Sequence, residues 1–159
     1  MNTSRPNAIV EEAIALGCIP ELSKSATRRR EVRYGINSRI DLLLEEEGLP
    51  DCYVEVKNVT LLDGPQTAAF PDSVTKRGTK HLEELAAMVS EGHRSVLFFL
   101  VSRSDVTSMR PAEAIDPIYA KTLRWAQKQG VEVLAYRTKL SSDGVVIDKA
   151  IPVDTSALA

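Results

Sequence analysis

The segment that most limits the possible folds is 95–102, where every residue between the two terminal serines is apolar. A run of this length and composition is typical of a fully buried strand, because a strand with one solvated face alternates polar and apolar residues. A strand that is buried on both faces needs further layers of structure on either side of its sheet. We therefore expect segment 95–102 to be a central, covered strand.

The remaining segments predict a sheet with helices packed against it. Helical spacing of apolar residues predicts helices over 7–16, 76–90 and 119–129. Alternating or apolar runs predict further strands over 31–35, 39–44, 52–59, 131–136 and 145–151, the first three joined by short turns as an antiparallel meander. The order predicts an α/β fold with a mixed β-sheet flanked by helices, an α-βββ-α-β-α-β core. We expect residues 1–153 to form a single domain and 154–159 to be a frayed tail.

The composition is that of a globular protein, with 43% hydrophobic and 26% charged residues in a chain of 159. The net charge of -2 excludes a protein that attracts nucleic acid by its overall charge, so such a partner would need a local basic patch. No apolar run approaches the ~20 residues that cross a bilayer, and no signal peptide is evident, so we expect a cytoplasmic protein without a membrane partner. Cys18 and Cys52 lack metal-ligand spacing and are expected to be buried thiols.

The chemistry of the chain is concentrated in the middle hairpin of the meander. Asp41 interrupts an otherwise apolar strand, and Glu55 and Lys57 lie in the next one. Because strand side chains alternate between faces, Glu55 and Lys57 share one face, while Val54 and Val56 point into the core. The hairpin can bring Asp41 beside them. Two carboxylates and an amine are therefore expected in one small patch.

Such a patch has two interpretations that the spacing alone leaves open. A carboxylate among apolar residues needs a partner, and a divalent metal suits two close carboxylates. Mg²⁺ prefers hard oxygen ligands, and it can polarise a phosphodiester and activate a bound water. The ammonium of Lys57 can orient that water. Alternatively, Glu55 and Lys57 form an ordinary ion pair on a solvated strand.

Three long blocks carry a resemblance to a known family. Segments 38–41 (SRID), 52–60 (CYVEVKNVT) and 70–82 (FPDSVTKRGTKHL) resemble the sugar fermentation stimulation protein A (SfsA) family, as do shorter matches at 91–94, 111–112, 115–117, 119–120 and 130–136. That family is similar to the restriction-endonuclease-like PD-(D/E)xK nucleases. Its members usually carry an upstream OB-type domain thought to contact nucleic acid, and this sequence begins where the second domain would.

The resemblance implies roles for individual residues. Asp41 is the acid of the motif, and Glu55-Val56-Lys57 is the (D/E)xK element, so the implied catalytic residues are Asp41, Glu55 and Lys57. The implied metal ligands are Asp41, Glu55 and the carbonyl of Val56, with Mg²⁺ or Mn²⁺ as the cofactor. Glu12 matches an acidic family position and would be a further metal or water contact, or else a solvated helix charge.

The start of the helix expected over 76–90 is a candidate phosphate site. Free N–H groups at a helix N-terminus favour an anion, and Arg77 and His81 lie four residues apart on one face with Lys80 beside them. With the resemblance, these three residues are expected to bind nucleic acid. The alternative is that Arg77 and Lys80 are ordinary exposed charges and His81 is a partly buried histidine. We expect the three arginines 28–30 to be a solvated run.

Two functions remain open from the sequence. The first is a Mg²⁺-dependent nuclease that hydrolyses phosphodiesters of DNA, or of RNA. The second is a DNA-binding regulator of sugar (maltose) metabolism that keeps the nuclease fold without turnover, and a weaker third is a truncated remnant that no longer meets DNA. The oligomeric state is also open, a homodimer included.

Overall fold

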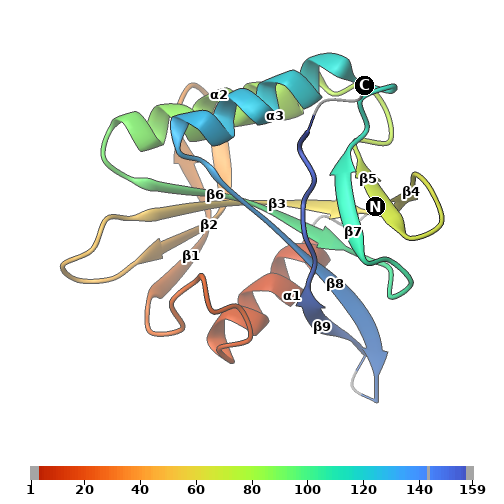
Figure 1. Cartoon of the computed structure of the whole chain (residues 1–159). Helices are drawn as coiled ribbons and strands as arrows, with labels where there is room; N and C mark the ends of the chain where they lie inside the picture. The colour runs from red at the N-terminus through yellow and green to blue at the C-terminus, as the bar shows by residue number, and fades with distance from the viewer. Residues whose placement is uncertain (1–3, 143, 157–159) are drawn as a thin grey trace.

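The main element of the fold is a six-stranded mixed sheet in the order β1-β2-β3-β6-β8-β9 (Figure 1). A computed structural model describes residues 4–142 and 144–156 of the chain. The strands are β1 (Thr27–Tyr34), β2 (Ser38–Glu45), β3 (Cys52–Val59), β6 (Arg94–Val101), β8 (Glu132–Ser141) and β9 (Gly144–Ala150). The first three pair antiparallel, β3-β6 and β6-β8 pair parallel, and β9 returns antiparallel at the edge. The expected meander is confirmed.

Helices cover both faces of this sheet. The helices α2 (Lys76–Ser90) and α3 (Pro117–Gln129) lie side by side over one face, and α1 (Ser4–Ala15) lies against the other (Figure 1). Strand β6 separates two apolar clusters: Leu97 and Phe99 belong to the one beneath α2 and α3, and Val96 and Phe98 to the one beneath α1. The expectation of a central strand covered on both faces, and with it the mixed α/β fold, is confirmed.

The starts of α2 and α3 are joined by one buried carboxylate. Asp116 caps α3 by accepting a hydrogen bond from the Tyr119 N–H over 2.9 Å, and it accepts a second from the Thr75 N–H over 2.8 Å. Thr75 in turn caps α2, where its Oγ1 accepts from the Gly78 N–H over 2.9 Å. A Cβ on Gly78 would lie 2.8 Å from the Thr75 side chain, so this close approach requires glycine. The caps therefore fix where the N-terminus of α2 points.

Two parts of the fold differ from the expectation. A second small sheet, β4-β5-β7, contains β4 (Leu61–Leu62), β5 (Thr67–Phe70) and β7 (Ser108–Pro111). Its strands have two to four residues, which is too short for a periodic pattern. Strand β1 also begins at Thr27 rather than at residue 31, so the three arginines 28–30 lie within a strand.

The C-terminal segment and one of the two cysteines differ from what the sequence predicts. Asp154 donates its N–H to the Met109 carbonyl over 2.8 Å, so the first residue of the expected tail is attached, while residues 157–159 lie outside the described part. Cys52 is buried as expected, but Cys18 is exposed, because it follows the end of α1 rather than facing the core. Among residues 4–142 and 144–156, no helix has the length and apolar character needed to cross a bilayer.

Candidate active site at the fork of two strands

Strands β2 and β3 separate at the position of the two predicted acids. Their pairing runs through Leu44 with Cys52, Leu43 with Tyr53 and Leu42 with Val54, and then it ends. The next pair in this register would be Asp41 opposite Glu55. Instead of a backbone acceptor on β2, the Val56 N–H donates to Oδ2 of Asp41 over 2.7 Å. The side chain of Asp41 thus fills the fork between the strands.

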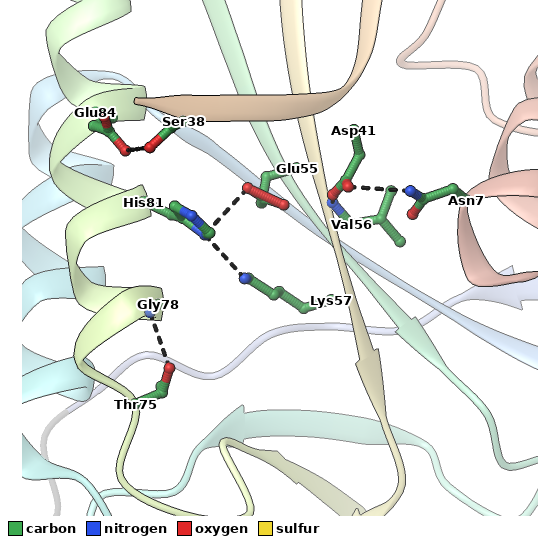
Figure 2. Close-up of polar contacts among 10 residues, drawn as sticks. All are labelled: Asn7, Ser38, Asp41, Glu55, Val56, Lys57, Thr75, Gly78, His81 and Glu84. Carbon is green, nitrogen blue, oxygen red and sulfur yellow. Dashed lines mark hydrogen bonds and ion pairs between the residues drawn. The ribbon is translucent and has the colours of Figure 1, made fainter. Parts of the chain in front are cut away.

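Helix α1 holds the other oxygen of the same carboxylate. Nδ2 of Asn7 donates to Oδ1 of Asp41 over 3.1 Å, and Asn7 is itself buried (Figure 2). The two donors, one from α1 and one from β3, fix the orientation of Asp41. Asn7 could not be recognised from the sequence, because an asparagine in the first turn of a helix is ordinary. Only the packing of α1 against the sheet reveals its role.

Glu55 is the most unusual group at the fork, because only 4% of it is exposed. Its Oε1 atom is buried and accepts no hydrogen bond from the described residues. Burial raises the pKa of Glu55 well above its usual range, and the neighbouring Asp41 carboxylate raises it further, while Lys57 and Arg77 oppose the shift. A buried carboxylate oxygen without a donor is a costly feature, and a cation is the partner that would satisfy it.

His81 of α2 lies against both Glu55 and Lys57. Its Nδ1 atom is 3.2 Å from Nζ of Lys57 and 3.3 Å from Oε1 of Glu55 (Figure 2). Burial, with Lys57 and Arg77 nearby, lowers the pKa of His81 to about 4, so the ring is neutral at pH 7. The neutral Nδ1 accepts a hydrogen bond from the Lys57 ammonium and has no proton to offer Glu55. His81 therefore holds Lys57 in place and leaves Glu55 Oε1 unsatisfied.

A cavity of about 650 Å³ opens over the fork. Its lining includes all the implied catalytic and metal-binding residues and all three of the expected phosphate contacts: Asp41, Glu55, Val56, Lys57, Arg77, Lys80 and His81. Arg77 and Lys80 are exposed at its α2 side, and Lys80 also donates to the Ile36 carbonyl over 3.1 Å. The structure thus brings together residues from two neighbouring strands and from the start of a helix.

Two of the expected residues are placed differently. Glu12 is exposed and lines a separate, shallow hollow with Cys18 and Val145, because α1 turns Asn7 rather than Glu12 toward the fork. The structure thus favours the solvated helix charge for Glu12. His81 is buried and its Nδ1 contacts Lys57, so its position suits holding that lysine better than gripping a phosphate.

The donor set fits a hard divalent cation. Asp41 and Glu55 supply carboxylate oxygens. The Val56 carbonyl leaves its strand on the same side as the Val56 N–H that reaches Asp41. Within the described residues no three His, Cys, Asp or Glu side chains gather as a metal cluster, so a site here would rest on two carboxylates. Mg²⁺ is commonly held by one or two carboxylates with waters and phosphate oxygens completing the shell.

These features define a class of protein: a mixed α/β domain, its sheet flanked by helices, with two acids and a lysine in a cavity where two antiparallel strands diverge. The chain belongs to the sugar fermentation stimulation protein family. The model of that family's "Sugar fermentation stimulation protein RE domain" matches residues 4–144. The family expectation from the sequence is confirmed.

Curated relatives are about half identical to the chain over the region that they share with it. A sugar fermentation stimulation protein homolog of Dinoroseobacter shibae is 52% identical over 159 residues, which is 100% of this chain and 65% of the relative. The homolog of Rhodospirillum centenum is 55% identical over 150 residues, 94% of this chain and 64% of the relative. The chain thus spans about 65% of the length of such relatives.

A solved structure of the same family supports the fold. The chain is similar to SfsA of Pyrococcus furiosus, which was determined in complex with Ca²⁺, with a TM-score of 0.87 and 28% sequence identity. The match covers 96% of this chain and 65% of that one. A family member therefore binds a divalent cation.

Proposed function

We propose that the chain is a divalent-metal-dependent nuclease that hydrolyses phosphodiester bonds of DNA. The observation that carries this proposal is the unsatisfied, buried Oε1 of Glu55 beside the fixed carboxylate of Asp41. Folding brings two acids together at a place where, among residues 4–142 and 144–156, the neutral His81 is the only basic side chain within ion-pair distance of either acid. A purely structural role would not offset the free-energy cost of burying an unpaired carboxylate, whereas a bound cation would offset it.

Asp41, Glu55 and the Val56 carbonyl would hold the cation, for which Mg²⁺ or Mn²⁺ is proposed. The P. furiosus relative in complex with Ca²⁺ supports a site for a hard, oxygen-seeking ion. When bound, such an ion polarises the phosphodiester and lowers the pKa of a bound water. The two donors to Asp41, Asn7 and the Val56 N–H, keep its oxygens directed at the fork.

Lys57 would orient the attacking water and balance charge on the phosphoryl group. Its Nζ is held by neutral His81, so the ammonium keeps two of its three protons for water or phosphate oxygens. Holding the amine in advance reduces the reorganisation needed when charge develops. His81 acts here as a positioning residue, because it reaches the reaction through Lys57.

Arg77 and Lys80 would bind the phosphates of the strand being cut. Both are exposed on the cavity side of α2, next to the N–H groups at the start of that helix. The helix N-terminus and two cations together suit a phosphate group. The net charge of the chain is negative, so this local set of cations would provide the attraction for nucleic acid.

A DNA-binding regulator without turnover is the second candidate. The observation that favours it is that no three His, Cys, Asp or Glu side chains form a metal cluster within the described residues, and that Glu12 lies outside the cavity. The relatives' names point to sugar utilisation, which suits regulation of that metabolism. In this case the acids would weaken phosphate binding, and removing their charge would strengthen it.

The experiment that separates the two candidates is a cleavage and binding assay on labelled single- and double-stranded DNA and RNA. The purified chain is incubated with Mg²⁺, Mn²⁺ or EDTA beside Glu55→Ala, with Glu12→Ala as the matched loss of an acid outside the cavity. Nuclease function requires metal-dependent cleavage that Glu55→Ala abolishes and Glu12→Ala retains. No cleavage, with tighter DNA binding by Asp41→Asn, would replace the nuclease with the regulator.

A further inference from the structure

We propose that Arg33 and Arg39, on the hairpin that forms the wall opposite α2, clamp a phosphate next to the one at the fork. This inference rests on the proposed function and deepens it, because it makes the substrate a polymeric nucleic acid rather than a single phosphodiester. The clamp is defined here as the two guanidinium groups of Arg33 and Arg39.

The two arginines are direct neighbours across antiparallel strands. Arg33 of β1 pairs with Arg39 of β2, and directly opposed residues project their side chains to the same face. Both are exposed, and within residues 4–142 and 144–156 neither side chain forms an ion pair or a hydrogen bond. Glu31 lines the same cavity but does not reach either guanidinium. Like charges directly opposed destabilise a sheet, so this pair weakens the fold that contains it.

Two other arginines of the same strand have acidic partners. Arg30 donates to Oε1 of Glu11 on α1, with its Nε at 2.9 Å, and Arg29 lies 3.4 Å from Oε1 of Glu45 on β2. Arg28, the remaining arginine of β1, has no acid partner and donates to the Ala26 carbonyl over 3.5 Å. Among the described residues, Arg33 and its cross-strand neighbour Arg39 have neither an acid nor a carbonyl partner for their guanidinium groups. An anion from outside the chain would satisfy the two guanidinium groups.

The position of the clamp suits the phosphate that flanks the reacting one. Arg39 lines the candidate active-site cavity and lies two residues before Asp41, a distance of about 7 Å along a strand. One strand of duplex DNA carries a negative charge every ~3.4 Å along the axis, so a neighbouring phosphate is within reach of a long side chain. Guanidinium groups bind phosphate through paired N–H donors.

Glu84 of α2 fixes the position of the β1–β2 hairpin relative to the helix that carries Arg77 and Lys80. Its carboxylate accepts from the Ile36 N–H over 3.0 Å and from Oγ of Ser38 over 2.5 Å (Figure 2). These contacts join the β1–β2 turn to the helix that carries Arg77 and Lys80. Arg39 and the α2 cations therefore line the cavity from two elements that Glu84 joins, and Arg33 lies directly across from Arg39 on the neighbouring strand.

The test uses a fluorescein-labelled 20-base-pair DNA duplex in EDTA, with affinity measured by anisotropy over a series of NaCl concentrations. The Arg33→Gln/Arg39→Gln variant keeps most of each side chain and removes both charges. Arg29→Gln removes one charge from the same strand; its cross-strand neighbour Leu43 belongs to the cluster on the α2 face, away from the clamp. Thermal unfolding without DNA is recorded for all three proteins.

The clamp predicts that the double variant binds DNA more weakly without losing thermal stability. The double variant should bind about tenfold more weakly at 0.1 M salt, with a log–log salt slope shallower by about 1 to 2, since each phosphate contact contributes ~0.9. Its unfolding temperature should rise or stay unchanged, because the repulsion is gone. Arg29→Gln should keep the wild-type slope.

Equal slopes for wild type and double variant would overturn the clamp alone, as would a lower unfolding temperature accompanying the weaker binding. Absence of binding by the wild type would overturn the clamp and the proposed DNA function together.

Discussion

Nζ of Lys57 on β3 donates a hydrogen bond of 3.2 Å to Nδ1 of His81 on α2. This contact joins the sheet to the helix at the point where Glu55 is buried. Because His81 is neutral, the bond fixes the amine without removing its charge. The arrangement makes Lys57 a held cation beside an unsatisfied carboxylate, and the proposed phosphodiester cleavage would use both groups.

Lys57→Ala should reduce DNA cleavage by at least about 100-fold, the usual contribution of a positioned proton-transfer or charge-balancing group. The fold should survive, because Lys57 is half-buried and the described structure records only the bond to His81. Initial rates with Mg²⁺ and circular dichroism melting would check both points. The matched control is Lys121→Ala, an exposed lysine of α3. Cleavage within a few-fold of wild type would remove Lys57 from the mechanism.

The sequence was enough to predict that the three candidate residues lie close together, but not which residues hold them there. Asp41, Glu55 and Lys57 could be predicted because period-two alternation in a hairpin determines which side chains share a face. The fork itself could not be predicted, since β2 and β3 stop pairing only when the Asp41 side chain takes the place of a backbone acceptor. Asn7 was also missed, because it comes from a helix distant in the sequence.

The basic residues also separate into some that the sequence could predict and others that it could not. Arg77 and Lys80 were predictable from helical spacing at the start of α2, and both line the cavity. Arg39 carried no signal, because its significance comes from pairing with Arg33 across two strands. Glu31 adopts a left-handed conformation, with φ of 56°, within β1, and such a local change of backbone cannot be inferred from composition.

Glu55→Gln should stabilise the metal-free protein at pH 7.5. The pKa of Glu55 is raised in the folded state, so ionisation opposes folding as the pH rises above the ordinary carboxyl range, and glutamine does not ionise. The unfolding temperature in EDTA should increase by about 2–4 °C, the effect of about 1 kcal/mol in a protein of this size. The gain should disappear near pH 4. Glu12→Gln is the exposed control, and a loss of stability at pH 7.5 in Glu55→Gln would contradict the account.

His81→Gln should remove part of the acid sensitivity of the fold. The pKa of His81 falls to about 4 in the folded protein, so the unfolded chain binds more protons between pH 4 and the usual histidine range. His81 therefore contributes a loss of stability as the pH drops from 6.5 to 4, opposite in sign to the contribution of Glu55, and the variant lacks this loss. Glutamine keeps an acceptor for Lys57 but does not titrate. Urea unfolding at several pH values measures the two slopes, and identical slopes would show that His81 protonates freely in the folded state.

Asp116→Ala should destabilise the protein by about 2 kcal/mol, because it removes a helix cap and leaves two backbone N–H groups without their acceptor. The unfolding temperature should fall by roughly 4–8 °C. Differential scanning calorimetry would measure the change, with the exposed Asp72→Ala as control. If both variants melt alike, the link between the starts of α2 and α3 contributes no stability.

The central claim is that Asp41 and Glu55 hold one divalent cation at the fork of β2 and β3. Crystals of the wild-type protein soaked in Mn²⁺ and measured at the manganese absorption edge would test it most directly. One anomalous peak is expected at about 2.2 Å from oxygens of both carboxylates, and it should be absent when Glu55→Gln crystals are treated alike. A peak bound elsewhere, or none at the fork, would contradict it.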